Sequence, residues 1–172
     1  MVEIVRADAK KTEWLQVVVS HLADEEYGLP IKHIQEIIRL PEITHMPGLP
    51  GFVEGIINLR GKIIPIIDLR KKFVLPLKPK NDKNRIIIVE IMSVEGTHEK
   101  QNIGLVVDGV TEVIRLSKDQ IDEIPPSIAQ INAAFLSGVG KLEKRIIILL
   151  DINSVINEIE KSLLKDMETK PA

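Results

Sequence analysis

The chain contains an internal repeat, and this feature restricts its possible folds more than any other. Tyr27–Leu40 aligns without gaps on Ile103–Leu116, and Phe52–Asp68 aligns on Phe135–Asp151. The second copy carries extra residues between its two blocks, which we place in 117–134. Repeats of this length usually represent two copies of one supersecondary unit. The sequence therefore predicts that residues 1–172 form a single domain of two pseudo-symmetric, intertwined β subdomains, with each aligned block in its own barrel.

Several segments are apolar at consecutive positions rather than at alternate ones. Examples are Ile63-Ile64, Ile66-Ile67 and the run Ile86–Val89. β-Branched residues favour strands, and a strand with one face in solvent would alternate apolar with polar residues. These segments are therefore predicted to be strands that are buried on both faces. In a chain of 172 residues this pattern indicates two packed layers, or two barrels that share a core.

The C-terminal part of the chain has a different periodicity. Apolar residues recur at helical spacing between Ile152 and Leu164, directly after Asp151. The repeat aligns Asp151 with Asp68, which also precedes a stretch with helical tendency, Leu69–Phe73. Because aspartate is a preferred N-cap residue, we interpret both aspartates as structural caps. The predicted fold is thus all-β with a C-terminal helix.

Pro65 marks a predicted difference between the two copies, because it aligns with Ile148. Proline has no N–H group to donate to a β-ladder, so we expect Pro65 at a bend, a bulge or an edge. Ile148 can be bonded on both sides. The two barrels should therefore differ in how completely this strand is paired.

The composition excludes several classes of function. The net charge is −2, from 23 basic and 25 acidic residues, which is too balanced for a protein that mainly binds nucleic acid. The absence of cysteine excludes disulfides, thiol nucleophiles and cysteine–zinc sites. The sequence begins without a signal-peptide pattern, and no apolar run approaches the roughly 20 residues that cross a bilayer. We therefore expect a cytoplasmic protein with no nucleic-acid partner and no direct insertion into the membrane.

No catalytic or metal-binding constellation is evident. The histidines are scattered rather than paired at ligand spacing: His21, His33, His45 and His98. One alternative stays open, a small β-barrel hydrolase or isomerase in which Asp68 or Asp151 works with a histidine. That alternative requires hydrogen-bond contact between the two groups beside a pocket. The main prediction is a non-enzymatic protein without catalytic residues, cofactor or metal, which acts through its surfaces.

Glu36 and Arg60 are the charged residues that stand out within that prediction. Glu36 lies late in a predicted strand, Ile34–Leu40, and Arg60 lies in the tight turn of the predicted hairpin Gly55–Asp68. Both belong to the first subdomain. We therefore expect the two side chains to meet at the surface.

Five sequence segments together resemble the CheW family of chemotaxis coupling proteins. They are Asp24–Gly28, Ile34–Ile37, Phe52–Gly61, Pro65–Arg70 and Gly104–Val110. The similarity extends from about Trp14 to Leu164, which is nearly the whole chain. The run from Phe52 to Gly61 is its most specific part.

The resemblance implies both a fold and a role. The fold is two five-stranded SH3-like barrels packed on a shared core. The role is a scaffold that couples the cytoplasmic tip of chemoreceptors to the regulatory domain of the histidine kinase CheA, recruited to receptor arrays at the membrane. Family positions for receptor and kinase binding correspond to Ile34, Glu36, Gly55, Arg60, Ile86 and Val113. Gly104 and Gly138 correspond to structural positions.

Overall fold

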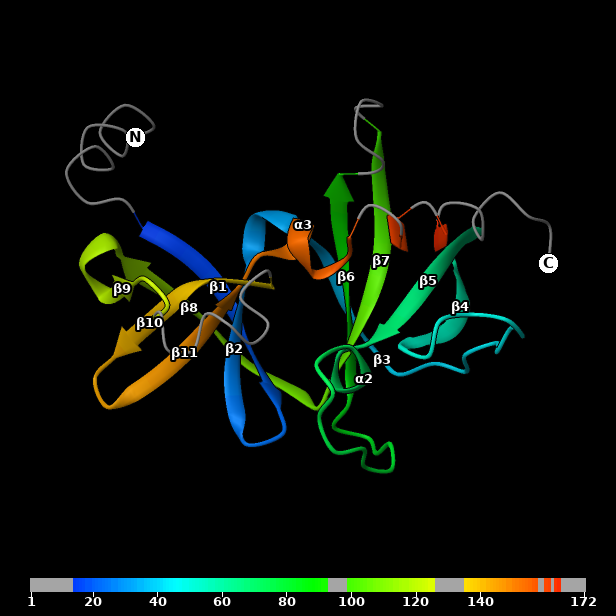
Figure 1. The fold of residues 1–172 in the computed structure, drawn as a ribbon, viewed down its shortest axis with the longest axis horizontal. Helices are drawn as coiled ribbons and strands as arrows, with labels where there is room; N and C mark the ends of the chain where they lie inside the picture. The colour runs from blue at the N-terminus through cyan, green and yellow to red at the C-terminus, as the bar shows by residue number, and fades with distance from the viewer. Residues whose placement is uncertain (1–13, 93–98, 126–134, 158–159, 162, 165–172) are drawn as a thin grey trace.

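The computed structural model describes residues 14–92, 99–125, 135–157, 160–161 and 163–164. Their strands form two sheets that lie side by side (Figure 1). The first contains β1 (Trp14–Leu22), β2 (Glu25–Pro30), β8 (Gly109–Ser117), β9 (Ile121–Asp122), β10 (Leu136–Leu142) and β11 (Arg145–Leu150). The second contains β3 (Ile34–Arg39), β4 (Val53–Leu59), β5 (Lys62–Asp68), β6 (Arg85–Met92) and β7 (Lys100–Val107). Short helical segments are η1 (Ile31–His33), α2 (Leu69–Lys72), η2 (Lys118–Gln120) and α3 (Ile152–Val155).

The two sheets are the two barrels that the sequence predicts. Barrel A has the strand order β8-β1-β2-β11-β10-β9, and barrel B has the order β3-β6-β7-β5-β4. Barrel B has the expected five strands. Barrel A has a sixth, because the inserted stretch of the second copy forms η2 and the two-residue strand β9, which pairs with β10. The equivalent place in barrel B has only an isolated bridge between Thr44 and Ile56.

The repeat is structural, but one expectation about it is wrong. The blocks Tyr27–Leu40 and Ile103–Leu116 do not each lie in one barrel: β2 belongs to barrel A and β3 to barrel B, while β7 belongs to barrel B and β8 to barrel A. Each copy thus donates a strand to the other barrel. The alignment identifies which segments are equivalent, but it does not show whether a strand pairs within its own copy of the repeat or with strands of the other copy.

Strand registers show the pseudo-symmetry directly. Gly28 of β2 pairs in parallel with Leu149 of β11, and its equivalent Gly104 of β7 pairs in parallel with Ile66 of β5. Leu149 and Ile66 are themselves equivalent in the repeat.

Three apolar clusters fill the molecule, which explains why consecutive residues of one strand are buried. One cluster fills barrel A around Val17, Ile114 and Leu149. Another fills barrel B and includes Ile86 and Ile88. The third lies between the barrels and contains Ile87, Val89, Leu105 and α3 residues Ile152 and Val155. Alternate residues of β6 therefore face two different cores, as the run of isoleucines predicts.

The predicted C-terminal helix is interrupted, which corrects the expectation of one helix from Ile152 to Leu164. Helix α3 ends at Val155, and Ile156 has extended dihedral angles (φ −115°, ψ 124°). The side chains of Asn157 and Glu160 accept reciprocal hydrogen bonds from each other's backbone N–H groups, at 2.8 and 2.9 Å. This is a capping box, and it begins a new helical segment. The apolar spacing continues across the break because Ile156 and Leu164 contact the same core.

The two aspartates stand at the N-cap positions of α2 and α3, but only one caps in the usual way. The Oδ1 atom of Asp68 accepts a hydrogen bond from the backbone N–H of Arg70 at 2.9 Å. The Oδ2 atom of Asp151 accepts one from the hydroxyl of Ser154 at 2.8 Å, and the Asp151 side chain makes no capping hydrogen bond to the backbone of α3.

Pro65 and Ile148 differ in their pairing. Ile148 pairs with Val139 on one side and with Tyr27 on the other. Pro65 pairs with Ile56 alone, because the ladder between β5 and β7 begins only at Ile66. The parallel ladder has three residue pairs in each barrel, but in barrel B it starts after the proline, so only this position lacks its second partner, as the missing N–H of proline predicts.

Candidate protein interface

A tight turn positions Arg60 at the end of the β4–β5 hairpin. Arg60 and Gly61 both have positive φ angles, 50° and 86°, which matches the right-handed twist of a two-residue hairpin. The side chain of Asn58 supports the turn by accepting a hydrogen bond from the Gly61 N–H at 2.9 Å. The sequence Asn-Leu-Arg-Gly therefore fixes the backbone position from which the Arg60 side chain extends.

The guanidinium group of Arg60 meets the carboxylate of Glu36 on β3. Nη1 of Arg60 donates to Oε2 of Glu36 at 3.3 Å, and Nη2 pairs with Oε1. The Arg60 side chain is 71% exposed and that of Glu36 is 29% exposed. Because ion pairs in water contribute little to folding, the pair defines surface shape and charge rather than stability.

Ile34 and Val113 occupy different surroundings. Ile34 is half-buried and packs against the core between the barrels. Val113 is 52% exposed on β8, an edge strand of barrel A. Val113 therefore lies in the other barrel from the Glu36–Arg60 pair.

Gly55 and Ile86 do not present side chains to a partner, which corrects their assignment as contact residues. Ile86 is fully buried inside barrel B. Gly55 is buried at a bulge of β4, with a φ of 149°. A Cβ atom at Gly55 would lie 2.1 Å from the backbone oxygen of Thr44. Neither residue therefore offers an exposed side chain at the surface.

Gly104 and Gly138 occupy close-packed positions, as their predicted structural role requires. A Cβ at Gly104 would lie 2.6 Å from Cδ1 of Ile66 and 2.7 Å from Cγ2 of Ile86. A Cβ at Gly138 would lie 3.0 Å from the backbone oxygen of Asp122.

Sequence reasoning missed a second charged site, although the repeat contains the signal for it. Glu112 is the equivalent of Glu36, and its Oε2 accepts from Nη2 of Arg145 at 3.3 Å. Arg145 also donates to Glu26, with Nη2 to Oε2 at 2.6 Å. The hydrogen bond from Arg145 lowers the pKa of Glu26 below its usual value. In each barrel an arginine thus pairs with the equivalent glutamate of an edge strand, and Arg145 also pairs with Glu26.

An exposed apolar residue accompanies each of these glutamates. Ile37, next to Glu36, is 38% exposed, and it is the repeat equivalent of Val113, next to Glu112. The combination of an exposed aliphatic side chain and a charged pair on an edge strand is suited to protein contact.

The geometry gives no support to an enzymatic site. Asp68 is 1% exposed, and its Oδ2 accepts from Nζ of Lys80 at 2.8 Å. No hydrogen bond joins Asp68 or Asp151 to His21, His33 or His45, and His98 lies outside the described residues. Burial lowers the pKa of His33 and Lys32 lowers it further, while the charges of Asp151 and Glu90 partly oppose this shift. Within the described part of the chain, no group of acidic residues and histidines could hold a metal ion.

Known proteins resemble the chain over most of its length. A family model described as a CheW-like domain matches residues 16–160. The chemotaxis protein CheW of Klebsiella aerogenes is 34% identical over 92% of this chain and 92% of its own length. CheW of Helicobacter pylori is 33% identical over 85% of this chain and 84% of its own. The crystal structure of the scaffolding protein TtCheW from Thermoanaerobacter tengcongensis superposes with a TM-score of 0.73 at 42% identity, covering 83% of this chain and 88% of that one. The chain therefore belongs to the CheW family.

Proposed function

We propose that this chain, a non-enzymatic chemotaxis scaffold, couples the cytoplasmic tip of chemoreceptors to the regulatory domain of the histidine kinase CheA. Membership of the CheW family supports the scaffold role. The exposed pair Glu36–Arg60, held on β3 and the β4–β5 turn, is the observation that carries the proposed site.

The arrangement of the candidate residues supports a bridging role. Ile34, Glu36, Ile37 and Arg60 lie in barrel B, whereas Val113 and the Glu112–Arg145 pair lie in barrel A. A bridging protein needs two separate surfaces, because one patch cannot hold two partners at once. Ile34 and Glu36 on one barrel and Val113 on the other supply them.

Recruitment to receptor arrays would then follow from receptor binding. None of the helices in the described residues has the length and apolarity needed to cross a membrane. The proposal therefore places the chain at the membrane through its protein partners alone.

Reversing the charge of either member of the pair should weaken receptor coupling while leaving the fold intact. We expect Arg60→Glu and Glu36→Arg each to reduce receptor binding by at least about tenfold, because like charges at an interface rim oppose association. The melting temperature should stay nearly unchanged, since the pair is exposed. A pull-down of receptor fragment and kinase, combined with thermal melts, measures both quantities.

The double reversal distinguishes two ways in which the pair can act. If the pair shapes the surface, the double variant regains coupling, because the internal attraction is restored. If each charge contacts the partner, the double variant stays defective. Lys144→Glu, at the exposed turn of barrel A that is equivalent to the β4–β5 turn, is the matched control. Normal coupling by both single variants would exclude the pair from the site.

A further inference from the structure

Residues 75–84, between α2 and β6, form no helix or strand, yet side-chain contacts hold them against the barrels. Nζ of Lys80 donates to Oδ2 of Asp68, at the end of β5, at 2.8 Å. Nδ2 of Asn84 donates to the carbonyl oxygen of Asp108, between β7 and β8, at 3.1 Å. Segment 75–84 therefore has a defined position on the rest of the molecule.

This segment forms one wall of a pocket of about 440 Å³, a size typical of small-molecule sites. The other walls come from the β1–β2 turn, from the end of β5 with α2, and from the end of β7. Four cationic and two anionic residues line the pocket, so the lining has a net charge of +2. The six are Arg70, Lys78, Lys80, Lys83, Asp68 and Asp108.

The two carboxylates of the pocket already have partners. Oδ1 and Oδ2 of Asp108 accept hydrogen bonds from Nε and Nη2 of Arg70, at 2.8 and 2.5 Å. Oδ1 of Asp68 accepts from the backbone N–H of Arg70 at 2.9 Å, and its Oδ2 accepts from Lys80. Because all four carboxylate oxygens are engaged, they are not free to bind a cation.

The donors of the pocket, in contrast, are not all engaged. Lys78 and Lys83 form no ion pair with any carboxylate of the described residues. Oδ1 of Asn81 accepts from the N–H of Lys83 at 2.9 Å, and its Nδ2 has no acceptor in the same part of the chain. Burial raises the pKa of Asp108, but hydrogen bonds and nearby charges, that of Lys78 included, lower it by more. The groups left over are therefore donors, and they suit a ligand that is anionic and rich in acceptors.

The barrel fold does not require these charges, because the second copy of the repeat lacks them. The equivalents of Asp108 and Arg70 are Lys32 and Asn153. Asparagine cannot form an ion pair with the lysine. The charged pocket is therefore a property of one copy and not of the repeated unit.

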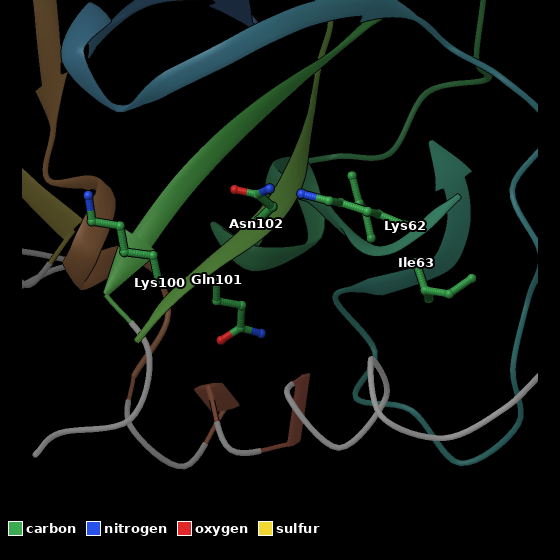
Figure 2. A pocket seen from close by; sticks show the side chains of 6 residues that line it. Lys62, Ile63, Lys100, Gln101 and Asn102 are labelled. Carbon is green, nitrogen blue, oxygen red and sulfur yellow. The ribbon is translucent and has the colours of Figure 1, made fainter. Parts of the chain in front are cut away.

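The pocket between β5 and β7, of about 290 Å³, does not bring its polar groups together (Figure 2). The side chains of Lys62 and Asn102 lie on one side of this strand pair, and that of Gln101 lies on the other. One ligand cannot contact all three. The lining of the pocket beside segment 75–84 is different, because the ion pairs and hydrogen bonds described above join its charged groups to one another.

We propose that the pocket beside segment 75–84 binds a small phosphate monoester. Such a group carries a charge of about −2 near neutral pH and three acceptor oxygens, which complements the net charge of the lining and its free donors. Nζ of Lys78, Nζ of Lys80 and Nδ2 of Asn81 donate to the phosphate oxygens, and the remainder of the ligand contacts Pro79 and Val106. None of these residues belongs to the predicted receptor and kinase contacts, so the site is independent of the proposed function.

NMR titration of the intact chain tests the proposal. The probes are inorganic phosphate and glucose 6-phosphate at constant ionic strength, and the signals are the side-chain amide of Asn81 and the ε-methylene groups of Lys78 and Lys80. We expect saturable shifts with both probes, whereas glucose and acetate leave the signals in place. Equal shifts with acetate, or no saturation with glucose 6-phosphate, would exclude a phosphate-ester site. Tighter binding of a phosphoserine peptide than of glucose 6-phosphate would overturn a small-molecule ligand.

Variants of the same chain identify the groups responsible. Lys78→Gln should weaken binding of glucose 6-phosphate by at least about tenfold, since it removes a charge-assisted hydrogen bond. Asn81→Asp keeps the acceptor for the Lys83 N–H but replaces the free donor by a carboxylate oxygen, and it should weaken binding at least as much. Lys144→Gln makes the same change in net charge at the exposed turn of barrel A, and it should bind like the parent. Unchanged binding by either pocket variant with a native backbone spectrum, or an equal loss in Lys144→Gln, contradicts the proposal.

Discussion

Replacing Gly55 by alanine is expected to lower the free energy of unfolding by about 3 kcal/mol, an effect of overpacking and backbone strain together. The φ angle of 149° is one that residues with a side chain rarely adopt. The new Cβ would lie 2.1 Å from the backbone oxygen of Thr44. That oxygen also accepts from the N–H of Ile56 at 2.9 Å, so the bridge between Thr44 and Ile56 would have to move.

Gly138 provides the matched control, because it is the repeat equivalent of Gly55. Its φ lies outside the positive range, and a Cβ would lie 3.0 Å from the nearest backbone oxygen. We therefore expect Gly138→Ala to cost about 1 kcal/mol, the typical size for a point mutation. Denaturant unfolding of both variants measures the difference. If Gly55→Ala lost receptor coupling while its stability stayed unchanged, Gly55 would be a contact residue after all.

Replacing Arg70 by alanine should lower the free energy of unfolding by about 3 kcal/mol, because it breaks a buried ion pair. Nε of Arg70 donates to Oδ1 of Asp108 at 2.8 Å, and Nη2 donates to Oδ2 at 2.5 Å. A third donor, Nη1, reaches the carbonyl oxygen of Pro76. The Arg70 side chain is 6% exposed, while that of Asp108 is 28% exposed. Because Asp108 is partly exposed, we expect the loss of unfolding free energy to lie at the low end of the range for buried ion pairs.

The pair also joins the two barrels. Asp108 lies between β7 of barrel B and β8 of barrel A, and its Oδ2 accepts from the Ala23 N–H of the β1–β2 turn at 2.8 Å. Arg70 belongs to α2, which follows β5 of barrel B. Loss of the arginine should therefore weaken the contact between barrels. Arg39→Ala, at an exposed position of β3, is the control and should change stability by less than about 0.5 kcal/mol.

The pH dependence of stability gives an independent check on this pair. Burial opposes ionisation of Asp108, but the hydrogen bonds from Arg70 and Ala23 outweigh burial and lower its pKa below the ordinary value. The contribution of a carboxylate with a lowered pKa is present above its unfolded-state pKa of about 3.9 and is lost as the pH falls through the folded-state pKa. The stability difference between the parent and Arg70→Ala should therefore be constant near neutral pH and shrink in acid. A difference that grows as the pH falls would contradict this assignment.

Much of the architecture could be predicted from the sequence. The repeat predicts two equivalent subdomains, and the isoleucine run Ile86–Ile88 predicts strands between two cores. Arg60-Gly61 predicts the tight turn, and Asp68 predicts a helix start. These features depend on residues close together in the chain, whose spacing and conformational preferences can be read directly.

Other features depend on segments that meet only in the folded molecule. Strands are exchanged between the barrels, Gly55 lies close to Thr44, and Arg70 pairs with Asp108. Each of these contacts joins segments that the repeat alignment does not relate to each other. The helix break at Ile156 preserves the apolar spacing, so periodicity alone did not reveal it.

The sequence by itself determined that this chain forms two β barrels whose strands are buried on both faces, with a charged turn at Arg60. Strand periodicity and turn preference are local properties, so they can be read from the sequence. Only the tertiary structure decided which of the predicted site residues are exposed. It buried Gly55 and Ile86, placed Val113 on the other barrel, and opened the pocket between β5 and β7. The exposure of a residue and the pairing of its strand depend on how segments that are distant in the sequence pack together. A local sequence pattern is compatible with more than one such packing.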